Sequence, residues 1–130
     1  MKVVFDINVL VSALVFPGGR GEAALHRIVE ERDVLLLSPA ILDELMGVLA
    51  RKFARDREGL ARIAVFLSDL AVTVRPRGRL KVAADDPDKR ILECAVAGQA
   101  DAIVTGDRAL LALGTFRDIR LMTLAGYLDA

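Results

Sequence analysis

Four carboxylates stand where predicted strands end or where nearby helices begin, and their chemistry defines a possible site: Asp6, Glu44, Asp88 and Asp107. Asp6 directly follows residues 3–5, a short apolar run typical of a strand that is buried on both faces. Asn8 comes two residues later, so its side chain can turn towards the same end of that strand. Open α/β sheets bind ligands at the carboxyl ends of their strands, and the four acids are therefore expected to meet in one cleft.

Carboxylates crowded into one cleft raise one another's pKa values, and this repulsion is usually relieved by a bound divalent cation. Oxygen ligands favour Mg²⁺ or Mn²⁺, whereas one histidine and one cysteine offer neither a zinc site nor a serine-type triad. The chemistry that this set predicts is metal-assisted hydrolysis of a phosphodiester bond. Asn8 and Thr105 are expected to hold the carboxylates or a water molecule by hydrogen bonds.

The elements that must position these acids alternate between short apolar strands and amphipathic helices. Strands are predicted at residues 3–5, 34–37, 71–74, 102–104 and 119–122, and helices at 22–32, 40–53, 56–70, 88–98, 108–113 and 124–128. Residues 9–16 form a further apolar run to which neither structure is assigned. The alternation predicts an α/β fold, a three-layer sandwich of Rossmann type with a mainly parallel five-stranded sheet flanked by helices.

Composition limits the class of protein. The 130 residues predict one domain, and the lone Cys94 excludes an internal disulfide. With 18 basic and 18 acidic residues the formal net charge is zero, so any binding of nucleic acid must rest on a local patch. Hydrophobic residues make up 54%, from which we expect surplus apolar surface to be buried in a homo-oligomer. No signal-peptide pattern or membrane-spanning run is recognised, and the cytoplasm is the expected location.

Four stretches together resemble the PIN-domain family, and in particular its VapC-like toxin ribonucleases. Residues 6–13 (DINVLVSA) are similar to the family's D-T-N-V-L-V-S-A start, and residues 38–45 (SPAILDEL) are similar to its glutamate-bearing helix. Residues 88–95 (DKRILECA) and 100–107 (ADAIVTGD) are similar to its closing half. Each stretch alone is a weak motif, whereas all four in this order over nearly the whole chain are specific.

The resemblance implies a Mg²⁺- or Mn²⁺-dependent endoribonuclease, usually dimeric, that forms the toxin half of a toxin–antitoxin pair with a small antitoxin protein. It implies catalytic and metal-binding roles for the four acids, with Asp86 as the alternative third acid. Glu93 is a supporting group that could approach the cleft from one turn further along the same helix. Arg20 and Arg108, near strand ends, are the favoured contacts to the RNA backbone, whereas residues 75–81 are interpreted first as a solvated basic loop.

Ile7 stands where the family pattern has Thr, which removes a hydroxyl beside the first acid. A catalytically inactive PIN-like module that binds or scaffolds is therefore the alternative function, and it predicts no metal-dependent cleavage. A phosphotransfer receiver domain also groups acids at strand ends, but the sequence Thr105-Gly106-Asp107 fits that class poorly.

Overall fold

The computed structural model describes residues 1–81 and 85–130. In this part of the chain six strands form one sheet in the spatial order β3-β2-β1-β4-β6-β5. The strands are β1 (Lys2–Phe5), β2 (Val34–Leu37), β3 (Val72–Thr73), β4 (Ala102–Val104), β5 (Thr115–Phe116) and β6 (Ile119–Met122). Every neighbouring pair is parallel except β5 with β6. The predicted α/β fold with a mainly parallel sheet is confirmed.

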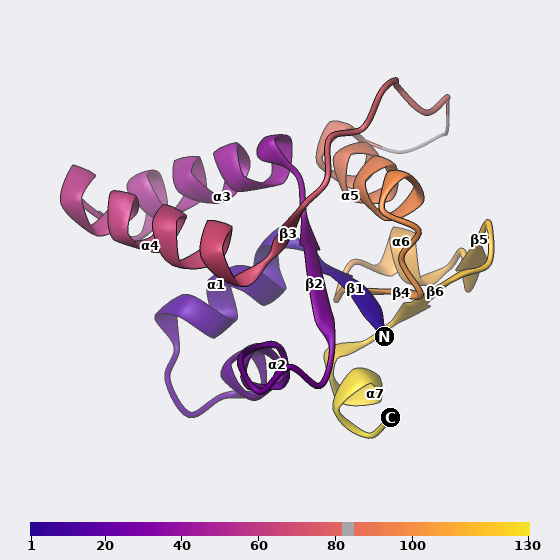
Figure 1. Ribbon diagram of the computed structural model, residues 1–130, viewed down its shortest axis with the longest axis horizontal. Coiled ribbons are helices and arrows are strands. Elements are labelled where there is room, and N and C mark those ends of the chain that lie inside the picture. The colour runs from indigo at the N-terminus through magenta and orange to yellow at the C-terminus, as the bar shows by residue number, and fades with distance from the viewer. Residues whose placement is uncertain (82–84) are drawn as a thin grey trace.

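The helices that connect the strands are α1 (Ile7–Val15), α2 (Arg20–Val29), α3 (Pro39–Lys52), α4 (Arg57–Leu70), α5 (Asp86–Ala97), α6 (Arg108–Leu111) and α7 (Leu124–Leu128). In Figure 1, α1 to α4 lie to the left of β2, and α5 lies to its right. None of the described helices combines the length and the hydropathy that crossing a bilayer requires.

The order of the strands defines where a ligand would bind. The chain runs outward from β1 through β2 to β3 and then returns across the sheet to β4, the other neighbour of β1 (Figure 1). The strand order therefore reverses between β1 and β4. In open α/β sheets the crevice at such a reversal, beyond the carboxyl ends of the strands, is the usual ligand site.

β1 and β4 form the centre of the core and bring the site residues to one edge. Residues 3–5 are at most 1% exposed, and the three residues of β4 are fully buried. The two strands pair in parallel register, with Phe5 opposite Val104. The Asp6 amide extends this pairing by donating a 3.1 Å hydrogen bond to the Val104 carbonyl. Asp6 and Thr105 therefore leave the core at the same edge of the sheet.

Two elements, α1 and β5, were not predicted from the sequence. Residues 9–16, which had no assignment, largely belong to α1, and this helix begins at Ile7 because the Asp6 side chain caps it. β5 is a two-residue strand that pairs antiparallel with β6 and adds a sixth strand to the predicted five. The turn between β5 and β6 places Arg117 and Asp118 at positive φ, a conformation that usually requires glycine or asparagine.

Candidate active site

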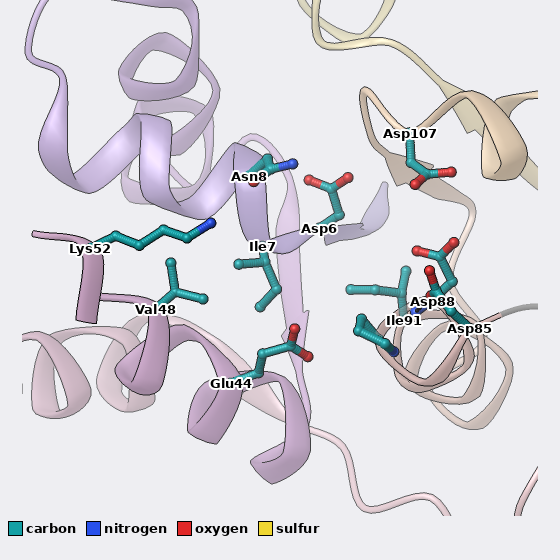
Figure 2. A pocket seen from close by; sticks show the side chains of 11 residues that line it. Asp6, Ile7, Asn8, Glu44, Val48, Lys52, Asp85, Asp88, Ile91 and Asp107 are labelled. Carbon is teal, nitrogen blue, oxygen red and sulfur yellow. Dashed lines mark hydrogen bonds between the residues drawn. The ribbon is translucent and has the colours of Figure 1, made fainter. Parts of the chain in front are cut away.

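An open pocket lies at the edge of the sheet where β1 and β4 end, between α3 and α5. Its volume is about 240 Å³, and its lining consists of Asp6, Ile7, Asn8, Glu44, Val48, Lys52, Asp85, Pro87, Asp88, Ile91 and Asp107. Figure 2 shows the side chains of Asp6, Asp88 and Asp107 around one space, with Glu44 reaching towards it from α3. The pocket thus brings together all four acids that the sequence singled out.

Asp6 is the most enclosed of these acids, with 7% of its surface exposed. Its Oδ1 accepts a 3.0 Å hydrogen bond from the Val9 amide and so caps α1. Its Oδ2 accepts a hydrogen bond from the Thr105 hydroxyl. Because both oxygens are fixed by neighbours, the carboxylate is held in one orientation at the carboxyl end of β1.

Thr105 connects the first acid of the site with the last. Its hydroxyl donates to Asp6 and accepts a 3.0 Å hydrogen bond from the Asp107 amide. Asp107 in turn caps α6, since its Oδ1 accepts a 2.9 Å hydrogen bond from the Leu110 amide. Thr105 is completely buried, so water does not compete for its hydroxyl. The ends of β1 and β4 are therefore joined through one side chain.

α5 brings two further acids to the pocket. Asp85 is the N-cap of this helix, because its Oδ1 accepts a 3.0 Å hydrogen bond from the Asp88 amide. The helix therefore begins at Asp86, two residues before the predicted start, and Asp88 lies in its first turn. Burial, followed by the negative charges of Asp107, Asp85 and Asp6, raises the pKa of Asp88 from 3.8 to about 6. Repulsion from the neighbouring carboxylates therefore contributes to this shift in addition to burial.

α3 supplies the wall that faces α5. Glu44, Val48 and Lys52 recur every fourth residue, so they share the face of the helix that lines the pocket. Figure 2 shows the Lys52 side chain on the side of the pocket away from Asp88 and Asp107, with its amino group directed towards Asn8. Among the described lining residues Lys52 is the one cation.

The donor atoms of the pocket fit a hard divalent cation. Five carboxylates, from Asp6, Glu44, Asp85, Asp88 and Asp107, face one lysine. Mg²⁺ and Mn²⁺ favour carboxylate oxygens, and Mg²⁺ usually keeps several of its waters. Within residues 1–81 and 85–130, no three His, Cys, Asp or Glu side chains lie close enough together to enclose a cation by themselves. A cation held in this pocket would complete its coordination with water or phosphate oxygens.

The acids predicted around the third position separate in the structure. Asp85 and Asp88 line the pocket, whereas Asp86 is exposed and lies outside it. Glu93 is buried on α5 but also lies outside the pocket, and its Oε2 accepts a 2.9 Å hydrogen bond from the Leu80 amide. The position of Asp88 in the pocket therefore favours it over Asp86 as the third acid. Glu93 instead contacts the loop before α5.

Of the other predicted site residues, some line the pocket and others lie outside it. Asn8 lies beside Asp6 in the lining of the pocket (Figure 2). Arg20, at the start of α2, and Arg108, at the start of α6, are exposed and are not part of the lining. Arg108 directly follows Asp107, so it is a neighbour of the pocket along the chain.

Two charged lining residues, Asp85 and Lys52, were not predicted as site residues from the sequence. The sequence signal for Asp85 is its position two residues before Pro87. Proline is favoured in the first turn of a helix, and aspartate is favoured at the N-cap that precedes it. The signal for Lys52 is its position eight residues after Glu44, which returns to the same helix face after two steps of four.

Comparisons with known proteins agree with this geometry. The family model of the PIN domain matches residues 2–109. The chain is 32% identical over 117 residues to the uncharacterized protein MJ1680 of Methanocaldococcus jannaschii, a match that covers 87% of this chain and 75% of that protein. A chain in the crystal structure of VapBC2 from Rickettsia felis, bound to a DNA fragment from its promoter, has the same fold. The TM-score is 0.67 at 16% identity, and the match covers 95% of this chain and 98% of that one. The resemblance of the four sequence stretches is thereby confirmed, and the chain belongs to the PIN-domain family, a family of nucleases.

Proposed function

We propose that this protein is a Mg²⁺- or Mn²⁺-dependent endoribonuclease whose residues 1–130 form one nuclease domain. The observation that carries the proposal is the pocket itself, in which five carboxylates meet where the strand order reverses. Burial, together with the neighbouring carboxylates, raises the pKa of Asp88 to about 6, and such perturbed groups are typical of functional sites. They are well suited to a substrate whose phosphate reaches the protein together with a cation.

In this proposal Asp6, Glu44, Asp88 and Asp107 hold the cation and form the catalytic set. A cation held there supplies charge neutralisation for the phosphate and makes hydroxide available from water near neutral pH. Thr105 keeps the Asp6 carboxylate in one orientation through its hydroxyl, which is the kind of group that Ile7 does not supply.

Two further lining residues have roles that do not depend on the acids. Lys52 places a positive charge at the end of the pocket away from Asp88 and Asp107, where it can bind a phosphate oxygen of the RNA (Figure 2). The Asn8 side chain amide lies between Lys52 and Asp6 and can donate to the same phosphate or to the attacking water.

We further propose that the protein is the toxin half of a toxin–antitoxin pair, acts in the cytoplasm and forms a homodimer. The fold similarity to a chain of VapBC2 from Rickettsia felis supports this biological role. Exposed apolar side chains on α4, Val65 at 61% and Phe66 at 43%, support a surface for protein partners such as an antitoxin or a second copy.

An inactive PIN-like binding module is the second candidate function. The observation that favours it is the Ile7 side chain, which lines the pocket at the position where the family pattern has a threonine. This candidate predicts that RNA is bound and left intact in the presence of Mg²⁺ or Mn²⁺.

The deciding experiment is the incubation of a mixed pool of single-stranded RNA with the protein and Mn²⁺ or Mg²⁺. Parallel reactions contain EDTA or the Asp6→Asn protein, and thermal melting with and without the metal is recorded for both proteins. Cleavage that needs both the metal and Asp6 supports the nuclease. Neither cleavage nor a metal-induced rise in melting temperature leaves the binding module as the function.

A further inference from the structure

The loop at residues 75–81 separates its charged residues from its apolar ones. Arg75, Arg77, Arg79 and Lys81 are exposed, whereas Pro76 and Leu80 are half-buried. Leu80 packs against the hydrophobic core, and the loop and α5 together line a hollow of about 200 Å³. The loop is therefore attached to α5 by its apolar side and presents its cations to solvent.

A buried carboxylate fastens this loop to α5. Glu93, which is 5% exposed, accepts a 2.9 Å hydrogen bond from the Leu80 amide. The charge of Glu93 is balanced by Arg90, whose Nε and Nη2 donate to its two oxygens at 2.7 and 3.3 Å. Because Arg90 already neutralises Glu93, the anchor leaves the charges of the loop uncompensated.

No ion pair within residues 1–81 and 85–130 involves the four loop cations. The loop is therefore a concentrated positive patch on a protein whose formal net charge is zero. The pocket beside it has the opposite character, since its lining contains five carboxylates and one lysine. An RNA strand is repelled by such a pocket unless cations elsewhere on the protein hold its phosphates.

α5 sets the distance between the patch and the pocket. Asp85 and Asp88 stand at the start of this helix, and Glu93 lies five residues after Asp88. At a rise of 1.5 Å per residue, the anchor of the loop is roughly 7.5 Å along the helix from Asp88. The same five residues turn the helix through about 500°, so the anchor also lies about 140° around α5 from Asp88. An RNA strand that contacts both the patch and the pocket must therefore follow the surface around the start of this helix.

We propose that residues 75–81 bind the sugar–phosphate backbone of the RNA substrate beside the acidic pocket, with Glu93 as the positioning residue. This proposal rests on the proposed nuclease function. The exposed side of the loop offers charge with almost no apolar surface, because Pro76 and Leu80 turn towards α5. Protein partners bury an apolar centre at their interface, whereas single-stranded RNA presents a regular row of phosphates. The loop therefore fits RNA better than an acidic protein segment.

The test compares two variants of equal charge in the cleavage-blocked Asp6→Asn background. The first combines R75Q, R77Q and R79Q, and the second combines R32Q, R117Q and R120Q, which are exposed arginines outside the loop. Binding of a fluorescent single-stranded RNA is measured by anisotropy in EDTA from low to moderate salt. The loop variant is expected to bind at least about tenfold more weakly, and its slope of log K against log salt to fall by about 2, since each lost phosphate contact removes about 0.7. The control variant is expected to keep the slope of its parent.

Equal losses in both variants would mean that total charge alone governs binding, and an unchanged loop variant would mean that the loop is not in contact with RNA. Either result overturns the proposal. Displacement of the RNA by poly-glutamate as readily as by unlabelled RNA also overturns it, in favour of an acidic protein partner.

Glu93 is tested by the same salt slope. Glu93→Ala is expected to reduce the slope as the loop variant does, measured at a temperature where circular dichroism shows the variant to be folded. Glu93→Gln is expected to retain the slope, because its amide oxygen can still accept the Leu80 hydrogen bond. A folded Glu93→Ala protein with an unchanged slope contradicts the positioning role.

A small substrate separates failure of the loop proposal from failure of the nuclease. Wild-type hydrolysis of bis(4-nitrophenyl) phosphate with Mn²⁺ reports on the pocket without a bound RNA strand. Hydrolysis of this ester together with unchanged RNA binding by the loop variant contradicts the loop proposal alone. Loss of RNA binding in the loop variant, with a wild type inactive on both the ester and RNA, supports the loop and contradicts the nuclease alone.

Discussion

The Thr105 hydroxyl donates a hydrogen bond to Oδ2 of Asp6, although 99 residues separate the two in the sequence. The contact follows from the parallel register of β1 and β4, in which Phe5 faces Val104 and the next residue of each strand emerges at the same edge. Thr105 also accepts a hydrogen bond from the Asp107 amide, so the acids after β1 and β4 share one support. The site therefore depends on a residue that itself carries no charge.

Replacing Thr105 by valine is expected to keep the shape of the side chain and to remove both hydrogen bonds. A buried Asp6 oxygen then lacks its donor, which should lower the free energy of unfolding by about 1–3 kcal/mol. Loss of the support should also weaken Mn²⁺ binding roughly tenfold or more. Urea unfolding and metal titration measure the two effects, and Thr105→Ser is the control that should restore most of each. Wild-type metal affinity in Thr105→Val would mean that Asp6 needs no such support.

Replacing Asp6 separates its electrical role from its role as a helix cap. Asp6→Asn retains an oxygen for the Val9 amide and relieves repulsion among the acids, so without metal it should unfold at or above the wild-type temperature. Asp6→Ala loses the cap and should be less stable than Asp6→Asn by about 1 kcal/mol. Both variants should lose RNA cleavage by roughly 100-fold or more, equivalent to about 3 kcal/mol of transition-state stabilisation. An Asp6→Asn protein that melts below wild type and keeps its metal-induced shift would count against Asp6 as a ligand.

The raised pKa of Asp88 predicts how stability changes with pH. Its pKa is 3.8 in its ordinary state and about 6 in the folded protein, so between these values the folded state holds more protons than the unfolded state. The free energy of unfolding in EDTA should therefore decrease as pH rises from about 4 to about 6, with no further contribution from Asp88 above that range. Urea unfolding of wild type and Asp88→Asn across this range isolates the contribution of Asp88, because the asparagine side chain does not titrate.

Metal binding should show the opposite trend with pH, because the cation competes with the proton on Asp88. The rise in melting temperature caused by Mn²⁺ should grow as pH increases towards about 6 and then level off. A constant difference in unfolding free energy between wild type and Asp88→Asn from pH 4 to 7 would show that Asp88 titrates normally.

Lys52→Ala is expected to lower kcat/KM for RNA about tenfold, which corresponds to about 1.4 kcal/mol, because a charged contact to phosphate is lost. Stability should change by less than about 0.5 kcal/mol, since Lys52 is exposed. Arg51→Ala is the matched control, as Arg51 is an exposed cation on the same turn of α3 that does not line the pocket. Similar losses in the two variants would mean that charge on α3, and not the place of Lys52, affects the rate.

Glu93→Ala should lower the free energy of unfolding by about 3 kcal/mol, because Arg90 and the Leu80 amide lose their shared partner. The loop should also open more often, and its arginines make this opening measurable with trypsin. Limited proteolysis followed by mass spectrometry should detect faster cleavage after Arg77 and Arg79 than in wild type. Glu93→Gln should lie between the two proteins. Equal cleavage rates in all three would show that Glu93 does not fasten the loop.

The sequence predicted the parts of the fold that depend on burial. Residues 3–5, 34–37 and 102–104 are short apolar runs, and each lies in a parallel strand, because only the inside of a sheet accepts such runs on both faces. α1 was missed for a related reason, since its buried residues Val9, Leu10, Val11 and Ala13 leave no regular polar face to reveal the helical period. β5 was missed because it has two residues and depends on a turn whose sequence lacks glycine and asparagine.

The site was predicted as far as single residues mark strand ends and motif positions. Asp6 and Asp107 were found because they follow the ends of predicted strands, and Glu44 and Asp88 because they stand near the starts of the neighbouring helices and also match the family motifs. To predict that Lys52 lines the pocket, one must know that α3 continues without a break for two turns beyond Glu44. Only then do Glu44 and Lys52 lie on the same face of the helix. The contact between Thr105 and Asp6 required the strand order, which no local pattern contains.

Asp6 and Asp107 each accept a hydrogen bond from the first turn of a helix, so the fold needs an oxygen at these positions, whereas the proposed catalysis needs a charge. An aspartate codon becomes an asparagine codon by a single base change. A gene under selection to silence this protein therefore has a short mutational route that removes the activity and leaves the protein folded. Silenced descendants should carry asparagine at these two positions, while alanine and glycine should be rare there, and a survey of inactive copies of such genes would test this bias.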